Sequence, residues 1–178
     1  MDIDALVKLT SRAWSLKILA LMHAGVPGRQ APLLAASGAS RTAFGHSLRH
    51  LEERGLLERN PGHGHPLRPE FRLTVQGQAL APIAHRIDGV VRNDAGAILL
   101  RKTWTVPLLA VAQRPRGFSE LKRALTPITD RALATSLRDL GAQNWIERSV
   151  RVEAHPPRPS YRVVNEGAQI SRAIGLPL

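Results

Sequence analysis

The chain of 178 residues contains no cysteine. This absence excludes disulfide bonds, zinc sites built on thiolates and the sensing of oxidants through a thiol. The sequence also has no apolar run long enough to cross a membrane, and its first residues are acidic, unlike those of a secretory signal. We therefore expect a soluble, cytoplasmic protein without membrane association.

Motifs of enzymes are missing as well. The sequence has no Walker loop, no Gly-x-Ser-x-Gly elbow and no His-Glu-x-x-His motif. His46 and His50 stand four apart, with His63 and His65 close in sequence, but no cysteine or convincing carboxylate completes a set of ligands. The interpretation is a protein that is not an enzyme, with no catalytic residues, no metal and no cofactor.

Lysine is scarce, whereas arginine is abundant. Only four of the 25 basic residues are lysines, and with 14 acidic residues the formal net charge is +11. A charge of this size favours a polyanionic partner, and the planar guanidinium group suits phosphates and guanine edges. A GC-rich genome would also explain the arginine bias, although it explains the net charge less well.

The sequence resembles itself at an offset of 89 or 90 residues, which marks an internal repeat. Trp14–Ala20 aligns with Trp104–Ala110, and Ser47–Leu51 aligns with Ser136–Leu140. The same offset joins three further matches: Glu58-Arg59 with Glu147-Arg148, Arg68–Arg72 with Arg158–Arg162, and Gly77 with Gly167. Chance is a poor explanation for a constant offset, so we infer two copies of one domain.

Apolar spacing and turn residues predict the same order of elements in each copy. In the first copy we expect helices over Ala5–His23, Pro32–Ala36 and Ser40–Gly55, strands over Leu56–Arg59 and Phe71–Val75, and a closing helix over Gly77–Val91. In the second copy we expect helices over Ala97–Ala112 and Ser119–Leu125, a third helix capped by Thr129, strands over Trp145–Ser149 and Ser160–Val164, and a last helix over Glu166–Ile174.

Three helices followed by a β-hairpin is the winged-helix order. The predicted fold class is mainly α with small β-wings, in two tandem winged helix-turn-helix domains. Residues 1–92 form the first domain with a connector helix and residues 93–178 the second, with Asn93–Gly96 as the boundary. We expect core positions for the aromatic residues Trp14, Phe44, Trp104 and Trp145.

Both copies resemble the HxlR-type winged-helix regulators of bacteria, a branch close to the MarR-type repressors. The first copy carries the resemblance in Trp14–Leu19, Ser47–Arg59 and Arg68–Leu80. The second carries it in Lys102–Trp104, Gly117–Leu121, Ser136–Leu140 and Arg158–Arg162. Family members usually have one winged helix and pair as homodimers, whereas here two copies are fused. The resemblance implies a nucleoid-associated bacterial regulator, and further homodimerisation through the connector and terminal helices stays open.

A helix-turn-helix inserts its second helix, the third of each copy here, into the major groove of DNA. The predicted contact residues of the first copy are Arg41, Thr42, His46 and Arg49, with Arg68 beside the wing. Those of the second copy are Arg131, Thr135 and Arg138, with Arg158 beside the wing. Asp130 and Asp139 weaken the positive field of the second copy, so the first is the stronger candidate for reading bases. For Arg49, an ion pair with Glu53 on a solvated helix face is the competing interpretation.

We therefore expect a sequence-specific regulator of transcription, a repressor, that binds double-stranded DNA. Its two reading heads would be related by approximate two-fold symmetry and would bind an imperfect inverted repeat. Two other functions stay open. One is a tandem winged-helix adaptor that binds proteins, of the type found in chromosome-segregation accessory subunits. The other is a sensor with a ligand pocket between the copies.

Overall fold

The computed structural model describes residues 2–60, 69–151 and 158–176. The chain divides into two compact units. One comprises residues 11–89, and the other comprises the residues up to Thr10 together with residues 90–178. The sequence-based boundary at 92/93 therefore differs from this division mainly in the first ten residues, which join the unit of the second copy.

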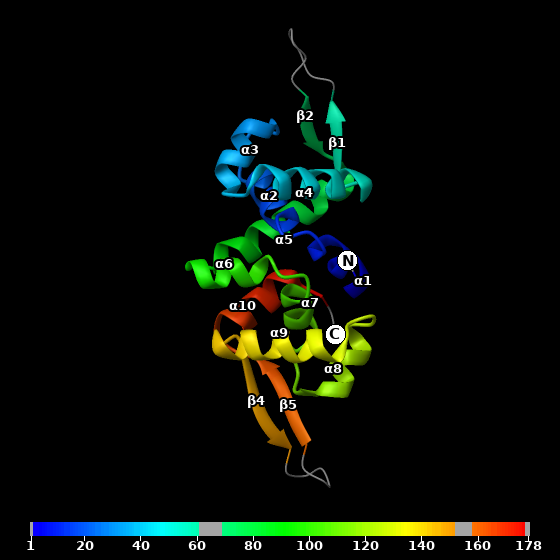
Figure 1. The fold of residues 1–178 in the computed structure, drawn as a ribbon, viewed down its shortest axis with the longest axis vertical. Helices are drawn as coiled ribbons and strands as arrows, with labels where there is room; N and C mark the ends of the chain where they lie inside the picture. Colours follow the sequence, from blue (N-terminus) through cyan, green and yellow to red (C-terminus); the bar gives the residue numbers. More distant parts are fainter. Residues whose placement is uncertain (1, 61–68, 152–157, 177–178) are drawn as a thin grey trace. The chain divides into compact units, whose positions relative to one another are not determined.

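The unit of residues 11–89 has the winged-helix order (Figure 1). It contains α2 (Ser15–His23), α3 (Gln30–Ser37), α4 (Arg41–Glu53), β1 (Leu57–Asn60), β2 (Glu70–Leu73) and α5 (Val75–Val90). The two strands pair in antiparallel register, with Leu57 opposite Leu73 and Asn60 opposite Glu70. Helix α2 packs against both α3 and α4, which forms the three-helix core expected from the sequence.

The second unit repeats this order and includes the N-terminal helix (Figure 1). It contains α1 (Ile3–Thr10), α6 (Asp94–Leu100), α7 (Thr105–Val111), β3 (Arg116–Gly117), α8 (Phe118–Ala124), α9 (Asp130–Ala142), β4 (Ile146–Arg151), β5 (Arg158–Val163) and α10 (Asn165–Ile174). Every residue of α7 is buried, and α1, α8, α9 and α10 pack against it. The mainly helical fold class with small antiparallel sheets is confirmed.

The prediction of one long first helix in each copy is wrong. Residues 11–14 form a turn between α1 and α2, and residues 101–104 form a turn between α6 and α7. Leu6 and Leu9 of α1 are buried in the unit of the second copy, whereas Leu16 and Leu19 of α2 are buried in the unit of residues 11–89. One continuous helix has a single apolar stripe, so burying these two stripes in different cores requires a break.

A third strand was not foreseen from the sequence. The short strand β3 pairs with β5, so the second sheet has the order β3-β5-β4. In the first copy an isolated bridge between Arg29 and Glu70 stands at the corresponding place. Two residues are too short for an alternating pattern, and only the neighbouring strand gives them strand geometry.

The aromatic residues differ in burial. Phe44 is 3% exposed and Trp145 is fully buried, as predicted, with the indole Nε1 of Trp145 donating to Glu166 Oε2 at 2.7 Å. Trp14 and Trp104 are only half-buried, because each stands just before the first turn of α2 or α7. Within the part of the chain that the structure describes, no helix is long and apolar enough to span a membrane.

Candidate nucleic-acid interface

The orientation of helix α4 is set by the apolar face that it buries. Phe44, Leu48 and Leu51 recur at helical spacing and are at most 3% exposed. The helix begins after Ser40, whose hydroxyl oxygen accepts a hydrogen bond from the backbone N–H of Ala43 at 3.3 Å. It is followed by Gly55, which has a positive φ of +65° and turns the chain into β1. These predictions for the third helix of the first copy are confirmed.

The opposite face of α4 carries the side chains that the sequence assigned to DNA. Arg41, Thr42, His46 and Arg49 are all exposed. Among the described residues no ion pair joins Arg49 to Glu53, although the exposure of Arg49 fits a solvated helix face as well as a DNA contact. The outward face of α4 therefore presents two guanidinium groups, a hydroxyl and an imidazole.

Helix α9 is built in the same way. Leu133, Leu137 and Leu140 form its buried face, and the hydroxyl of Thr129 accepts from the backbone N–H of Ala132 at 3.2 Å. The residues assigned to DNA from the sequence, Arg131, Thr135 and Arg138, are exposed. The two helices thus hold their outward residues on equivalent scaffolds.

The two carboxylates of α9 are neutralised by lysines. Lys122 of α8 lies 2.7 Å from Asp130 Oδ1, and Lys102 lies 2.7 Å from Asp139 Oδ2. Sequence reasoning treated these aspartates as weakening the positive field and missed their partners. The partners lie 8 and 37 positions away in the sequence, and neither follows from helical spacing within α9. Because both pairs are partly exposed, each adds little to the free energy of folding.

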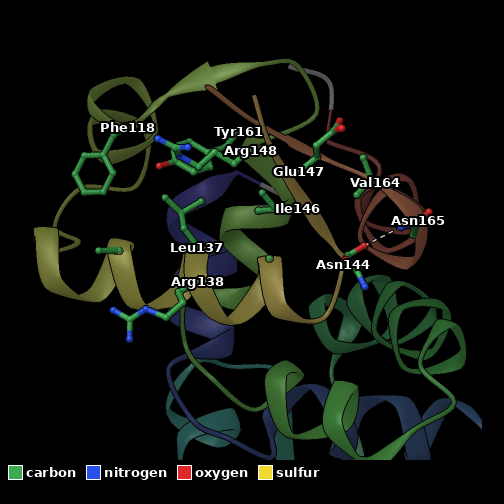
Figure 2. Close-up of a pocket in the computed structure, with 12 residues that line it drawn as sticks. Phe118, Leu137, Arg138, Asn144, Ile146, Glu147, Arg148, Tyr161, Val164 and Asn165 are labelled. Carbon is green, nitrogen blue, oxygen red and sulfur yellow. Dashed lines mark hydrogen bonds between the residues drawn. The ribbon is translucent and has the colours of Figure 1, made fainter. Parts of the chain in front are cut away.

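The outward side chains of α9 line two hollows. On one side, a groove of about 780 Å³ separates α9 from the β4–β5 hairpin, and Leu137, Ile146 and Tyr161 line it. Figure 2 shows Leu137 pointing toward the hairpin, whereas the guanidinium of Arg138 points away from it. On the other side, a hollow of about 400 Å³ is lined by residues that include Trp104, Arg131 and Thr135. Arg138 also lines the first hollow, so the outward arginines of α9 border both.

The wing positions are only partly described. Arg158 is exposed and begins β5, opposite Arg151 of β4. Its counterpart Arg68, a predicted contact of the first copy, lies outside the described residues, as do His63 and His65.

His46 and His50, which were weighed above as metal ligands, lie on different faces of α4. His50 is buried, with its Nε2 3.2 Å from the hydroxyl of Ser11, whereas His46 is exposed on the other face of α4. Within residues 2–60, 69–151 and 158–176, no group of three potential ligands is placed to hold a metal ion.

Two winged helix-turn-helix units with arginine-bearing outward helices define a class of DNA-binding domain. A family model described as HxlR-like helix-turn-helix matches the chain twice, over residues 9–95 and 99–176. The chain belongs to the HxlR-like helix-turn-helix family and is, as a member, a DNA-binding regulator of transcription. The two matches agree with the duplication inferred from the sequence offset.

One solved structure is similar over about half of the chain. It is a crystal structure of a transcriptional regulator of the MarR family from Porphyromonas gingivalis W83. The similarity covers 48% of this chain and 88% of that chain, with 21% sequence identity and a TM-score of 0.41. The comparison with curated proteins finds no match.

Proposed function

We propose that this protein is a sequence-specific repressor that binds double-stranded DNA through α4 and α9. The observation that carries the proposal is the exposure of arginines on the outward faces of both helices, opposite well-buried apolar stripes. Arginine at such a position can donate two parallel hydrogen bonds to the O6 and N7 atoms of guanine. Thr42 and Thr135 are suited to a thymine methyl group or a phosphate.

The wing residues Arg68 and Arg158 supply the second kind of contact in this proposal. A cation beside the hairpin reaches a phosphate or the minor groove, and it fixes the position of the reading helix without reading bases. With a formal net charge of +11, the whole chain attracts the duplex before specific contacts form. Each copy then contacts one half-site of the same operator.

The first experiment is a gel-shift titration of the full chain on genomic fragments around its own gene, at several salt concentrations. We expect a preferred fragment and an affinity that falls steeply with salt, because bound phosphates release counterions. Weak, salt-insensitive binding without a preferred fragment would overturn the proposal. That result would favour the adaptor that grips protein partners.

The second experiment is the double substitution Arg41→Ala/Arg49→Ala. Each arginine–guanine pair contributes about 1–3 kcal/mol of discrimination, so the preference for the operator over unrelated DNA should fall by about 5- to 150-fold per arginine. The matched control is Arg92→Ala/Arg172→Ala, which removes the same charge from exposed positions outside α4 and α9. If both variants lose preference equally, α4 is not the reading helix.

A further inference from the structure

The outward faces of α4 and α9 carry different side chains at equivalent positions. The two helices are aligned by their caps, Ser40 and Thr129, and by the shared Ser-Leu-Arg segment at Ser47 and Ser136. In this alignment one outward arginine is shared, Arg49 with Arg138. The other three outward positions differ: Arg41 with Asp130, Thr42 with Arg131, and His46 with Thr135.

The apolar stripes of the two helices are alike, although α9 has Asp139 where α4 has the buried His50. The buried apolar positions remain large, as Phe44 with Leu133 and Leu48 with Leu137 illustrate. The cap hydrogen bonds are also alike, at 3.3 Å and 3.2 Å. Both copies therefore keep the apolar stripe and the cap that position the helix. The residues that would contact base edges differ in charge and size.

Asp130 is the most informative of these changes. A carboxylate in the first turn of a reading helix can accept a hydrogen bond from the N4 amino group of cytosine, whereas arginine at the equivalent Arg41 pairs with guanine. Without a partner, the carboxylate would be repelled by nearby phosphates. Lys122 of α8, 2.7 Å from its Oδ1, offsets that repulsion. The corresponding helix of the first copy, α3, has no charged residue.

We propose that the two copies recognise different half-sites, so that the chain binds an asymmetric operator in one fixed orientation. The inference rests on the proposed DNA-binding function, and it adds the side chains that determine which bases each copy prefers. Arg41 and Arg49 select guanines in the first half-site. Asp130, supported by Lys122, selects a cytosine in the second half-site, next to bases contacted by Arg131 and Arg138. Two identical DNA-binding units would bind a perfect inverted repeat equally well in either direction. The two unlike copies of this chain bind their operator in one direction.

The decisive experiment gives α9 the outward face of α4. The variant Asp130→Arg/Arg131→Thr/Thr135→His gives α9 the same four outward residues as α4, and all three changed positions are exposed. Operators are selected from a random duplex library with the natural chain and with the variant, and thermal unfolding checks that both are folded. We expect two unlike half-sites for the natural chain and a nearly perfect inverted repeat for the variant. Each mismatched base pair should weaken binding by about 5- to 150-fold.

The orientation is tested separately with a tethered cleavage reagent. Because the chain has no cysteine, Gln30→Cys and Ser119→Cys each introduce a single attachment site, at exposed positions in the first turns of α3 and α8. An iron chelate on each thiol cleaves the DNA nearby. We expect Gln30→Cys to cut only beside the first half-site and Ser119→Cys only beside the second.

The outcomes separate this inference from the proposed function. Equal cleavage beside both half-sites by each cysteine variant, or selection of a perfect inverted repeat by the natural chain, would overturn the asymmetric operator while leaving DNA recognition intact. Failure to enrich any duplex would overturn the proposed function itself. Enrichment of unlike half-sites that the triple variant leaves unchanged would show that α9 is not the helix reading the second half-site.

Discussion

At the scale of single residues, the repeated glycines Gly77 and Gly167 have a common structural cause. A Cβ atom on Gly77 would lie 2.0 Å from the carbonyl oxygen of Leu56, and one on Gly167 would lie 2.2 Å from that of Trp145. The same two carbonyls accept hydrogen bonds from the backbone N–H groups of Thr74 and Val164. The closing helix of each copy thus begins pressed against the end of the loop before the hairpin, where only glycine fits.

We predict that Gly77→Ala destabilises the protein by about 1–3 kcal/mol. The added methyl group would clash with the backbone carbonyl of Leu56, and relieving the clash requires a shift of the backbone. The control is Gly45→Ala in the middle of α4, where a Cβ would meet nothing within 4 Å. That change should stabilise by about 0.5–1 kcal/mol, because alanine has the better helix propensity. Urea unfolding of both variants measures the free energies. A Gly77→Ala variant as stable as Gly45→Ala would contradict the explanation.

At the scale of elements, α4 and α9 depend on their caps as well as on their apolar stripes. Ser40 and Thr129 each satisfy one of the backbone N–H groups that an isolated first turn leaves unpaired. Both caps are exposed, so they contribute through this hydrogen bond and not through burial. The start of each helix sets where its outward side chains stand, so the caps also position the proposed DNA contacts.

We predict that Ser40→Ala lowers the free energy of unfolding by about 0.5–2 kcal/mol, whereas Ser40→Asn, which can still accept from the Ala43 N–H, is nearly neutral. Thermal melts followed by circular dichroism compare the two variants. Equal melting temperatures for the alanine and asparagine variants would show that the hydroxyl is not acting as a cap. Thr129→Ala and Thr129→Asn repeat the comparison for α9.

At the scale of the whole molecule, the N-terminal helix is part of the unit that contains the second copy. Helix α1 packs against α7, and the hydroxyl of Thr10 donates to the carbonyl oxygen of Thr103 at 2.8 Å. Leu6 is fully buried there. A segment that precedes the first copy in sequence therefore stabilises the core of the second.

We predict that Leu6→Ala destabilises the unit of the second copy by about 2–5 kcal/mol, as expected for a cavity in a core. Trp145, which is fully buried in that unit, reports its unfolding by fluorescence when Trp14 and Trp104 are replaced by phenylalanine. The control is Leu16→Ala, whose side chain is buried in the unit of residues 11–89. If Leu16→Ala shifts the Trp145 transition more than Leu6→Ala does, this division of the chain is wrong.

The charge of the whole molecule gives a second prediction at this scale. The logarithm of the DNA affinity should fall linearly with the logarithm of the salt concentration, by about 0.9 per phosphate neutralised. Arg158→Ala should reduce that slope by about 1 without changing the preferred sequence, because its proposed contact is a phosphate. Arg172→Ala, an exposed arginine of α10, is the matched control. A changed sequence preference in Arg158→Ala would show that the wing reads bases.

The sequence by itself determined the duplication, the order of the elements in each copy and the outward faces of α4 and α9. These features follow from short-range information: the constant offset, the spacing of apolar residues such as Phe44 and Leu48, and the cap at Ser40. The exposure of Arg49 and Arg138 follows from the same spacing, since a residue opposite a buried stripe faces solvent.

Only the tertiary structure decided the remaining features, because they depend on partners distant along the chain. The first helix breaks at residues 11–14 because α1 and α2 bury their leucines in different units, and β3 becomes a strand because β5 lies beside it. Lys122 and Lys102 neutralise the aspartates of α9 from other segments of the chain. Helical periodicity identifies the face that a side chain occupies, whereas its partner across space is set by how the elements pack.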